Sequence, residues 1–243
     1  MCRACLTAWR CKSATQPDGG EGLAKRKGII ATTPTLAERL RARYPAVSCR
    51  LMPDSIDLRE IGVGAKRHES IAGVLRIAWF STEINMKHML MILPALRRLH
   101  GELPLQVRIV SKAMLYELPG LSVEFVKWGL DTYQQDLQAC DAAVLPMAID
   151  ESTEVKSPNR LQLCMALGLP AVVSPLPSYL DQLGRHPEIA LVADSEEEWY
   201  SHLKALLDPA RRNEIAQRGR EIIEAEYTLE HYGERWYQTL FAD

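Results

Sequence analysis

The sequence predicts an α/β fold, a Rossmann-like parallel sheet flanked by helices. From Val74 to the end of the chain, short apolar segments alternate with helical segments, an order typical of strand–helix–strand units. Apolar residues make up 47% of the 243 residues and charged residues 25%, the balance of a soluble globular protein. Apolar runs such as residues 142–149 are far shorter than the roughly 20 residues of a membrane-spanning helix, so no transmembrane segment is expected.

The first elements precede this alternation. Residues 28–32 are predicted to form a short apolar strand. Thr33 then caps a helix whose first residue is Pro34, a pair of residues that favours a helix start. Residues 49–52 form a second short strand, and residues 58–73, which have few large apolar side chains, are expected to be a linker.

Apolar spacing predicts the strands that follow. Residues 75–80 are almost wholly apolar and predict a buried strand. The next helix, residues 89–99, carries Leu90, Leu93 and Leu96 on one face. The same reasoning predicts further strands at residues 105–110, 123–127, 142–146, 170–174 and 189–192.

Helical periodicity and capping residues predict the remaining helices. Ser195 and Glu198 form a capping-box pattern at one helix start, and Gly168 marks the end of another helix. These helices are expected at residues 133–140, 160–167, 178–183, 195–207, 209–227 and 229–240.

Charge and cysteine content narrow the functional class. A formal net charge of −2 creates no strong field toward nucleic acid or anionic lipid, so no nucleic-acid partner is expected. Charged residues, among them Arg3 and Arg10, interrupt the apolar run near the start, which argues against a signal peptide and for a cytoplasmic location. Cys2 and Cys5 have a metal-like spacing, but no second pair lies nearby, so no metal site is expected.

Ligands of parallel sheets bind at the carboxyl ends of the strands. Among the loops expected there, residues 156–160 read Lys-Ser-Pro-Asn-Arg and run directly into a helix. Lys156 and Arg160 lie at the entrance of that helix, where positive side chains and free N–H groups can bind an anionic ligand. The other loops to inspect are residues 81–87, 111–114, 128–132, 147–155 and 175–179.

Several segments together carry a resemblance to a known family. They read Arg-Ile-Ala-Trp-Phe-Ser at residues 76–81, Val-Glu-Phe-Val-Lys-Trp at 123–128, Leu-Gln-Ala-Cys-Asp-Ala-Ala-Val-Leu-Pro at 137–146 and Ser-Pro-Asn-Arg through Ala-Val-Val at 157–173. In this order and spacing they resemble the C-terminal domain of GT-B glycosyltransferases of family 4, the glycosyl transferases group 1. Residues 29–57 resemble the end of the N-terminal domain and its crossover.

The resemblance implies a domain organisation. Residues 74–243 would be the nucleotide-sugar-binding C-terminal domain, and residues 28–73 a fragment of the N-terminal domain with the interdomain linker. Most of the N-terminal domain would then be missing. Residues 1–27 lack periodicity and are expected to be disordered or the remnant of a longer segment.

The resemblance also implies an activity. The chain would be a retaining hexosyltransferase that moves a sugar from a nucleotide-diphosphate sugar to an unknown acceptor, without a metal or other cofactor. An acceptor domain on a partner chain is a further partner that it implies.

Two departures from the family pattern concern the donor site. Leu163 stands where the family has the second of two glutamates, the one that bonds the ribose. Glu154 is one residue out of register for the first glutamate, where Val155 stands. Lys87 fits the lysine that grips the donor diphosphate, but Ser81 stands in place of the companion arginine.

No catalytic residue can be assigned from the sequence. The candidate donor-binding residues are Ser81, Thr82, Lys87, Trp128, Glu154, Lys156, Ser157, Asn159 and Arg160. Each has a plainer interpretation: the three cations would be solvated, Glu154 would only solvate its loop, and Ser81 and Thr82 would form a plain turn. Asn159 is expected to be a helix N-cap. Trp128 is expected to be a buried core residue.

Two functions of different classes remain open. The first is a glycosyltransferase, or a donor-binding half that needs a partner chain. The second is a non-catalytic binding or scaffold module that keeps the fold but has lost nucleotide recognition, since fold and activity are separate properties. Leu163 favours the second function, whereas Lys87, Lys156 and Arg160 favour the first. An epimerase of similar shape is less favoured, because no carboxylate–histidine pairing is apparent.

Overall fold

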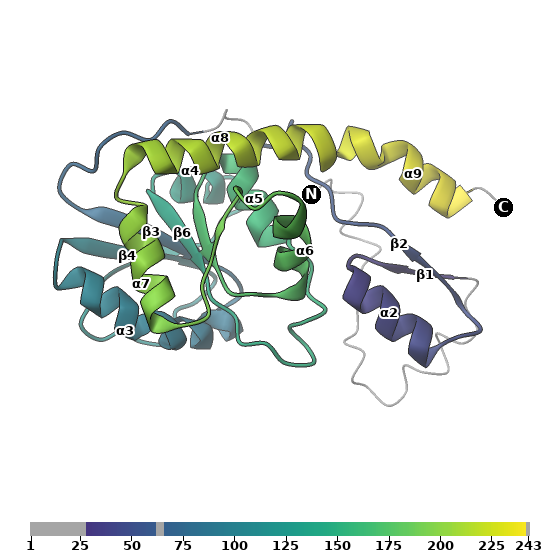
Figure 1. Cartoon of the computed structure of the whole chain (residues 1–243), viewed down its shortest axis with the longest axis horizontal. Helices are drawn as coiled ribbons and strands as arrows, with labels where there is room; N and C mark the ends of the chain where they lie inside the picture. Colours follow the sequence, from purple (N-terminus) through teal and green to yellow (C-terminus); the bar gives the residue numbers. More distant parts are fainter. Residues whose placement is uncertain (1–27, 62–65, 242–243) are drawn as a thin grey trace.

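The computed structural model describes residues 28–61 and 66–241. In this part of the chain, a six-stranded parallel sheet with helices on both faces forms the main domain, and a two-stranded unit lies beside it (Figure 1). The predicted α/β class and Rossmann-like sheet are therefore confirmed. The expectations for residues 1–27, including Cys2 and Cys5, lie outside the described residues.

The main sheet has the strand order β5-β4-β3-β6-β7-β8, and every neighbouring pair is parallel. Its strands are β3 (Leu75–Phe80), β4 (Leu105–Ser111), β5 (Ser122–Lys127), β6 (Ala142–Leu145), β7 (Ala171–Val173) and β8 (Leu191–Val192). The chain builds outward from β3 to β5, then returns to the other side of β3 with β6. Strands β3 and β6 therefore flank the topological switch point, where ligands of such sheets bind.

Alternating side chains of the central strands fill two apolar layers. Ile77 and Trp79 lie in one core with helices α3 (Met89–His100) and α7 (Glu196–Ala205). Ala78 and Phe80 lie in the other core, with α5 (Asn159–Leu167) and α6 (Pro177–Arg185). A strand places consecutive side chains on opposite faces, and a sheet covered on both faces needs apolar residues at nearly every position. This is why residues 75–80 read as an almost continuous apolar run.

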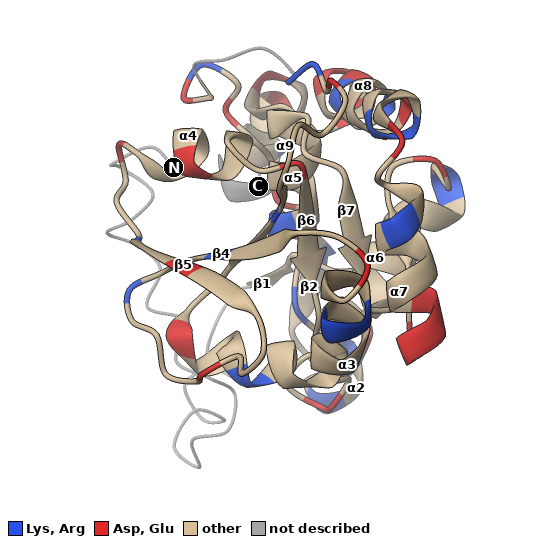
Figure 2. Ribbon diagram, turned by 90° about the vertical axis from the view of Figure 1, so that its left-hand side faces the viewer, with Lys and Arg blue, Asp and Glu red and all other residues tan. Residues whose placement is uncertain are grey.

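The remaining elements complete the layers and the ends of the chain. They are β1 (Gly28–Ala31), α2 (Pro34–Arg43), β2 (Ser48–Leu51), the 3-10 helix η1 (Glu83–His88), α4 (Tyr133–Gln138), α8 (Pro209–Glu226) and α9 (Leu229–Phe241). Figure 2 shows charged residues on the outer helices, including α7 and α8, whereas β7 carries none. Among the described residues, no helix is both long and apolar enough to cross a membrane.

Local sequence signals explain several helix ends. The Thr33 hydroxyl accepts a hydrogen bond from the Leu36 N–H at 3.1 Å, which confirms the predicted cap of α2. Ser195 and Glu198 form the predicted capping box at the start of α7. Gly168 ends α5 at φ 66°, a backbone conformation that a residue with a Cβ atom adopts only with strain.

Strands β1 and β2 form a separate parallel pair covered by α2. The last helix, α9, runs from the main domain across to this unit (Figure 1). Arg50 on β2 donates to the Thr239 carbonyl at 3.2 Å, and Arg235 on α9 donates to the Leu51 carbonyl at 2.9 Å. These contacts fix the two-stranded unit against the C-terminal helix.

The described part of the predicted linker is held by buried polar side chains. The backbone N–H of His68 donates to the Asn213 side chain at 2.8 Å, and Asn213 donates back to the His68 carbonyl at 2.7 Å. The His68 ring is buried and its Nε2 atom lies 2.9 Å from the Gly168 carbonyl. Nε2 must therefore carry the ring proton. Burial is the main cause that lowers the pKa of His68 from 6.5 to about 4.

This histidine predicts acid sensitivity. Below pH 6.5 the unfolded chain binds a proton that folded His68 does not, so stability falls as the pH drops toward 4 and the loss is then complete. The expected loss is about 3 kcal/mol. Urea unfolding at pH 7 and 4.5 measures it. His68→Gln keeps a donor for Gly168 but does not titrate, and should flatten this pH dependence, whereas exposed His231→Gln should not. If the unmodified chain and both variants lost the same stability between pH 7 and 4.5, the loss could not be assigned to His68.

Candidate functional site

The candidate site lies at the carboxyl edge of the sheet, where β3 and β6 separate. The loop after β3 contains η1, which the sequence patterns did not predict, and the loop after β6 runs from Pro146 to the start of α5. Since both strands are parallel and adjacent, the two loops leave the sheet side by side. Direct contacts join them.

The loop after β3 is organised around Asn85. Its side-chain amide donates to the Ser81 hydroxyl at 2.8 Å and to the Thr82 hydroxyl at 3.0 Å. Ser111 at the end of β4 donates to the Ser81 carbonyl at 3.0 Å. The predicted donor-binding residues Ser81 and Thr82 thus lie at this edge, with hydroxyl oxygens that already accept one hydrogen bond each.

His88 joins the two loops. The Ala148 N–H, after β6, donates to its Nδ1 atom at 3.2 Å, so Nε2 carries the proton of the neutral ring. His88 is buried, and burial lowers its pKa, followed by the charges of Lys87, Lys156 and Arg160. These three cations therefore lie within electrostatic reach of the His88 ring. His88 is a feature of the site that sequence reasoning did not select.

Lys156 makes a second link between the loops. Its ammonium group donates to the side-chain amide oxygen Oδ1 of Asn85 at 3.3 Å. Burial, and then the charges of Arg160 and Lys87, lower the pKa of Lys156, while Asp150 opposes the shift. Lys156 therefore belongs to a cluster of like charges.

Arg160, the second residue of α5, completes this cluster. Its Nη1 atom is buried and has no hydrogen-bond partner among the described residues. The guanidinium also bonds the buried side chain of Tyr179. Within residues 28–61 and 66–241, none of the three cations (Lys87, Lys156 and Arg160) forms an ion pair. A positive cluster at a helix start, whose charge Asp150 offsets in part, has the chemistry of an anion site.

The start of α5 differs from the predicted cap. Asn159 is the first helical residue, and Pro158 occupies the cap position without a side-chain hydrogen bond, so the N-cap assignment of Asn159 is wrong. Proline has no side-chain acceptor and fixes the chain just before the helix. The Ser157 and Asn159 side chains instead bond the carboxyl group of Asp54, which sequence reasoning did not select. Burial raises the pKa of Asp54 more than these bonds lower it.

Two other candidate residues lie away from the cation cluster. Glu154 forms an ion pair with Arg39 of α2. Trp128 is 40% exposed, so the expectation of a buried core residue is wrong. The reason is that β5 is an edge strand, paired only with β4, and Trp128 follows its end. Its ring stacks on Tyr133 with 5.9 Å between the centroids.

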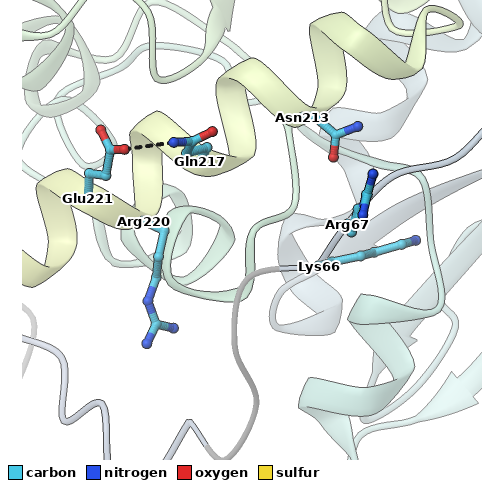
Figure 3. Close-up of a pocket in the computed structure, with 6 residues that line it drawn as sticks. All are labelled: Lys66, Arg67, Asn213, Gln217, Arg220 and Glu221. Atoms are coloured by element: carbon cyan, nitrogen blue, oxygen red, sulfur yellow. Dashed lines mark hydrogen bonds between the residues drawn. The ribbon is translucent and has the colours of Figure 1, made fainter.

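A pocket of about 460 Å³ lies elsewhere, beside α8 (Figure 3). Two of its cations are already bound. Lys66 donates to the Cys140 carbonyl, just before β6, and Arg220 donates to the Ala166 carbonyl at 2.7 Å. The pocket therefore lies toward the amino edge of the sheet, opposite to the edge at which ligands of such folds bind. Its lining residues are Lys66, Arg67, Asn213, Gln217, Arg220 and Glu221.

Metal-ligating side chains do not gather in the part of the chain that the structure describes. There, no three His, Cys, Asp or Glu residues lie together as a metal site requires.

Solved structures share this fold at low sequence identity. TarM matches with a TM-score of 0.69 at 11% identity, over 92% of this chain and 45% of TarM. Sucrose-phosphate synthase from Thermosynechococcus elongatus matches with a TM-score of 0.62 at 17% identity, over 92% of this chain and 61% of the synthase. Anabaena HepE, in complex with UDP and glucose, matches with a TM-score of 0.64 at 14% identity, over 89% of this chain and 63% of HepE. The chain thus spans about half to two thirds of the length of these proteins.

The sequence itself matches a family. No curated protein matches it closely enough to serve as a relative. The model of the family described as "Glycosyl transferase-like" matches residues 106–238, more than half of the chain, from β4 to α9. This range includes the loop after β6, the start of α5 and two of the three clustered cations. The chain therefore belongs to the glycosyl transferase-like family, with the fold of a GT-B glycosyltransferase C-terminal domain.

Proposed function

We propose that the chain binds a nucleotide-diphosphate sugar at the switch point between β3 and β6 and supports transfer of the sugar to an acceptor. The observation that carries this proposal is the cluster of Lys87, Lys156 and Arg160, which forms no ion pair among the described residues, with a buried and unpaired Nη1 atom on Arg160. Buried donors are normally satisfied, so an unpaired one favours a missing ligand.

A diphosphate suits this cluster. Its oxygens accept charge-assisted hydrogen bonds from guanidinium and ammonium groups, and N–H groups at the start of α5 add further donors. When the bond between sugar and diphosphate breaks, negative charge grows on the diphosphate, and fixed positive charge stabilises that state. The proposal therefore requires no metal. The neutral His88 ring offers an additional N–H donor between the two loops.

The complex of HepE, a structural neighbour, with UDP and glucose supports a nucleotide ligand for a chain of this fold. Trp128 and Tyr133 offer an aromatic face two strands from the cluster, where we place the base. Leu163 is half-buried on α5 and provides no oxygen for a ribose hydroxyl. We therefore expect affinity to come mainly from the diphosphate, and discrimination among nucleotides to be weak.

A thermal-shift experiment tests the proposal. UDP, GDP, ADP and their sugar conjugates are each added at millimolar concentration to the full chain, and a ligand that binds only the folded state raises the melting midpoint. We expect a shift with the diphosphates and none with uridine. Lys156→Ala should abolish this shift, whereas Lys127→Ala, an exposed lysine at the end of β5, should retain it. Absence of any shift with the unmodified chain would contradict the donor proposal.

The alternative is a non-catalytic module of the same family. Leu163 favours it, because the ribose contact typical of the resemblance is lost. If the chain binds nucleotide sugars, their hydrolysis, measured by the nucleoside diphosphate released, distinguishes a glycosyltransferase from a non-catalytic module. A chain that binds UDP-sugars but releases no UDP, with or without added acceptors, would be a non-catalytic module.

A further inference from the structure

The loop that carries Lys156 is held from outside the main domain. Three residues of the segment 28–57, namely Thr33, Arg39 and Asp54, contact the loop and the start of α5. Within the main domain, Asp150 accepts hydrogen bonds from the Ser152 and Thr153 N–H groups, and the Thr153 hydroxyl donates to the Ala148 carbonyl, so the loop also has a local network. The two-stranded unit and its crossover therefore add contacts from outside to a loop that is already bonded within itself.

Arg39 makes the central contact. Its guanidinium forms an ion pair with the Glu154 carboxylate, and Nη1 donates to the Glu151 carbonyl at 2.9 Å. One planar group thus binds a side chain and the backbone three residues earlier, which fixes the turn between them. Arginine suits this role, because its fork of donors holds two acceptors in one geometry.

Two weaker anchors lie on either side. Thr33, at the start of α2, donates to the Val155 carbonyl at 3.3 Å, directly before Lys156. Asp54, in the crossover, lies near the Ser157 and Asn159 side chains directly after Lys156: burial raises the pKa of Asp54, and these two polar side chains lower it in part. Lys156 therefore lies between two tethered positions, and its ammonium group reaches Asn85 from there.

We propose that Arg39 is a positioning residue that sets the donor loop through Glu154 and Glu151, and thereby places Lys156 in the cation cluster. This inference rests on the proposed nucleotide site. It also assigns Glu154 to Arg39 rather than to a sugar hydroxyl. Because the ion pair is partly exposed, its removal should change global stability little.

Hydrogen exchange of the full chain tests positioning without any ligand. Arg39→Ala should speed amide exchange in residues 150–157 by about threefold to tenfold, because local opening then loses one ion pair and one hydrogen bond. Arg41→Ala is the matched control, since Arg41 lies on the same helix but donates to Cys49 within its own unit. Unchanged exchange in the loop of Arg39→Ala would overturn the proposal.

Nucleotide titration is the second arm. With UDP as the probe, Arg39→Ala should weaken binding about threefold to tenfold with an unchanged melting midpoint, and Arg41→Ala should not. Arg39→Glu combined with Glu154→Arg should recover part of the affinity that Arg39→Glu alone loses. If UDP does not bind the unmodified chain, the nucleotide site fails while the exchange arm still decides the positioning role. If UDP binds Arg39→Ala as tightly as the unmodified chain, the positioning role is wrong.

Discussion

Arg160→Ala is expected to remove nucleotide binding without destabilising the free protein. The Arg160 side chain is half-buried, and its buried Nη1 atom has no partner among the described residues. Truncation of one partner in a buried, charge-assisted contact costs roughly 2–5 kcal/mol of binding energy. The dissociation constant for UDP should therefore rise by a factor of about 30 or more.

The stability of the ligand-free protein should change little. Arg160 lowers the pKa of Lys156 by like-charge repulsion, after the larger effect of burial, so removal of Arg160 relieves part of this repulsion. The lost bond to Tyr179 offsets that gain. We expect the melting midpoint of the ligand-free variant to stay within about 2 °C of the unmodified chain, a free-energy change below about 1 kcal/mol.

Isothermal titration with UDP and thermal unfolding without it measure the two quantities separately. Arg211→Ala provides the matched control, because Arg211 pairs with Glu214 on the outer surface of α8. Arg211→Ala should change neither the affinity for UDP nor the melting midpoint of the ligand-free protein. A large drop in the ligand-free melting midpoint for Arg160→Ala, with UDP affinity retained, would show that Arg160 serves the core through Tyr179 instead.

The sheet was predictable because its signal is local. Residues 75–80 were predicted as a strand and form β3 with the same bounds, since burial on both faces leaves an unbroken apolar run. Topology then predicted which loops meet. Lys87 and Lys156 are far apart in the sequence, yet parallel strands bring both to the same carboxyl edge.

The errors have a common physical origin, namely neighbours that the sequence does not display. Trp128 looks like a core residue, but the strand before it lies at the sheet edge, where one side is uncovered. Asn159 looks like a cap, but Pro158 occupies that position and Asp54 binds the Asn159 side chain. The pairing of Glu154 with Arg39 joins residues from separate units, and no periodicity reports such a contact.

Arg212→Ala is expected to cause the largest loss of stability among single polar substitutions. Arg212 is fully buried, and its guanidinium donates to three backbone carbonyls: Leu206, Leu207 and Glu69. The first two directly follow the end of α7, and the third belongs to the linker before β3. Truncation leaves these acceptors unpaired and opens a cavity, which together cost about 3 kcal/mol or more.

Urea unfolding measures this loss, and a fall of roughly 6–12 °C in the melting midpoint should accompany it in a chain of this size. Arg212→Met separates the two contributions, because methionine refills much of the volume but donates no hydrogen bond; recovery of most stability would assign the loss to packing. Arg211→Ala on the adjacent position should stay within about 0.5 kcal/mol.

Arg212→Ala and Arg160→Ala should have opposite effects on stability and on UDP affinity. Arg212 lies at the amino edge of the sheet, near the linker, whereas the proposed nucleotide site lies at the carboxyl edge. At a temperature where Arg212→Ala is folded, it should bind UDP with unchanged affinity, because no contact of Arg212 reaches the cation cluster. Arg160→Ala should show the reverse pattern, with stability kept and affinity lost. If both variants lost affinity in proportion to stability, UDP binding would report the folded fraction alone, and the cluster of Lys87, Lys156 and Arg160 would have no specific role.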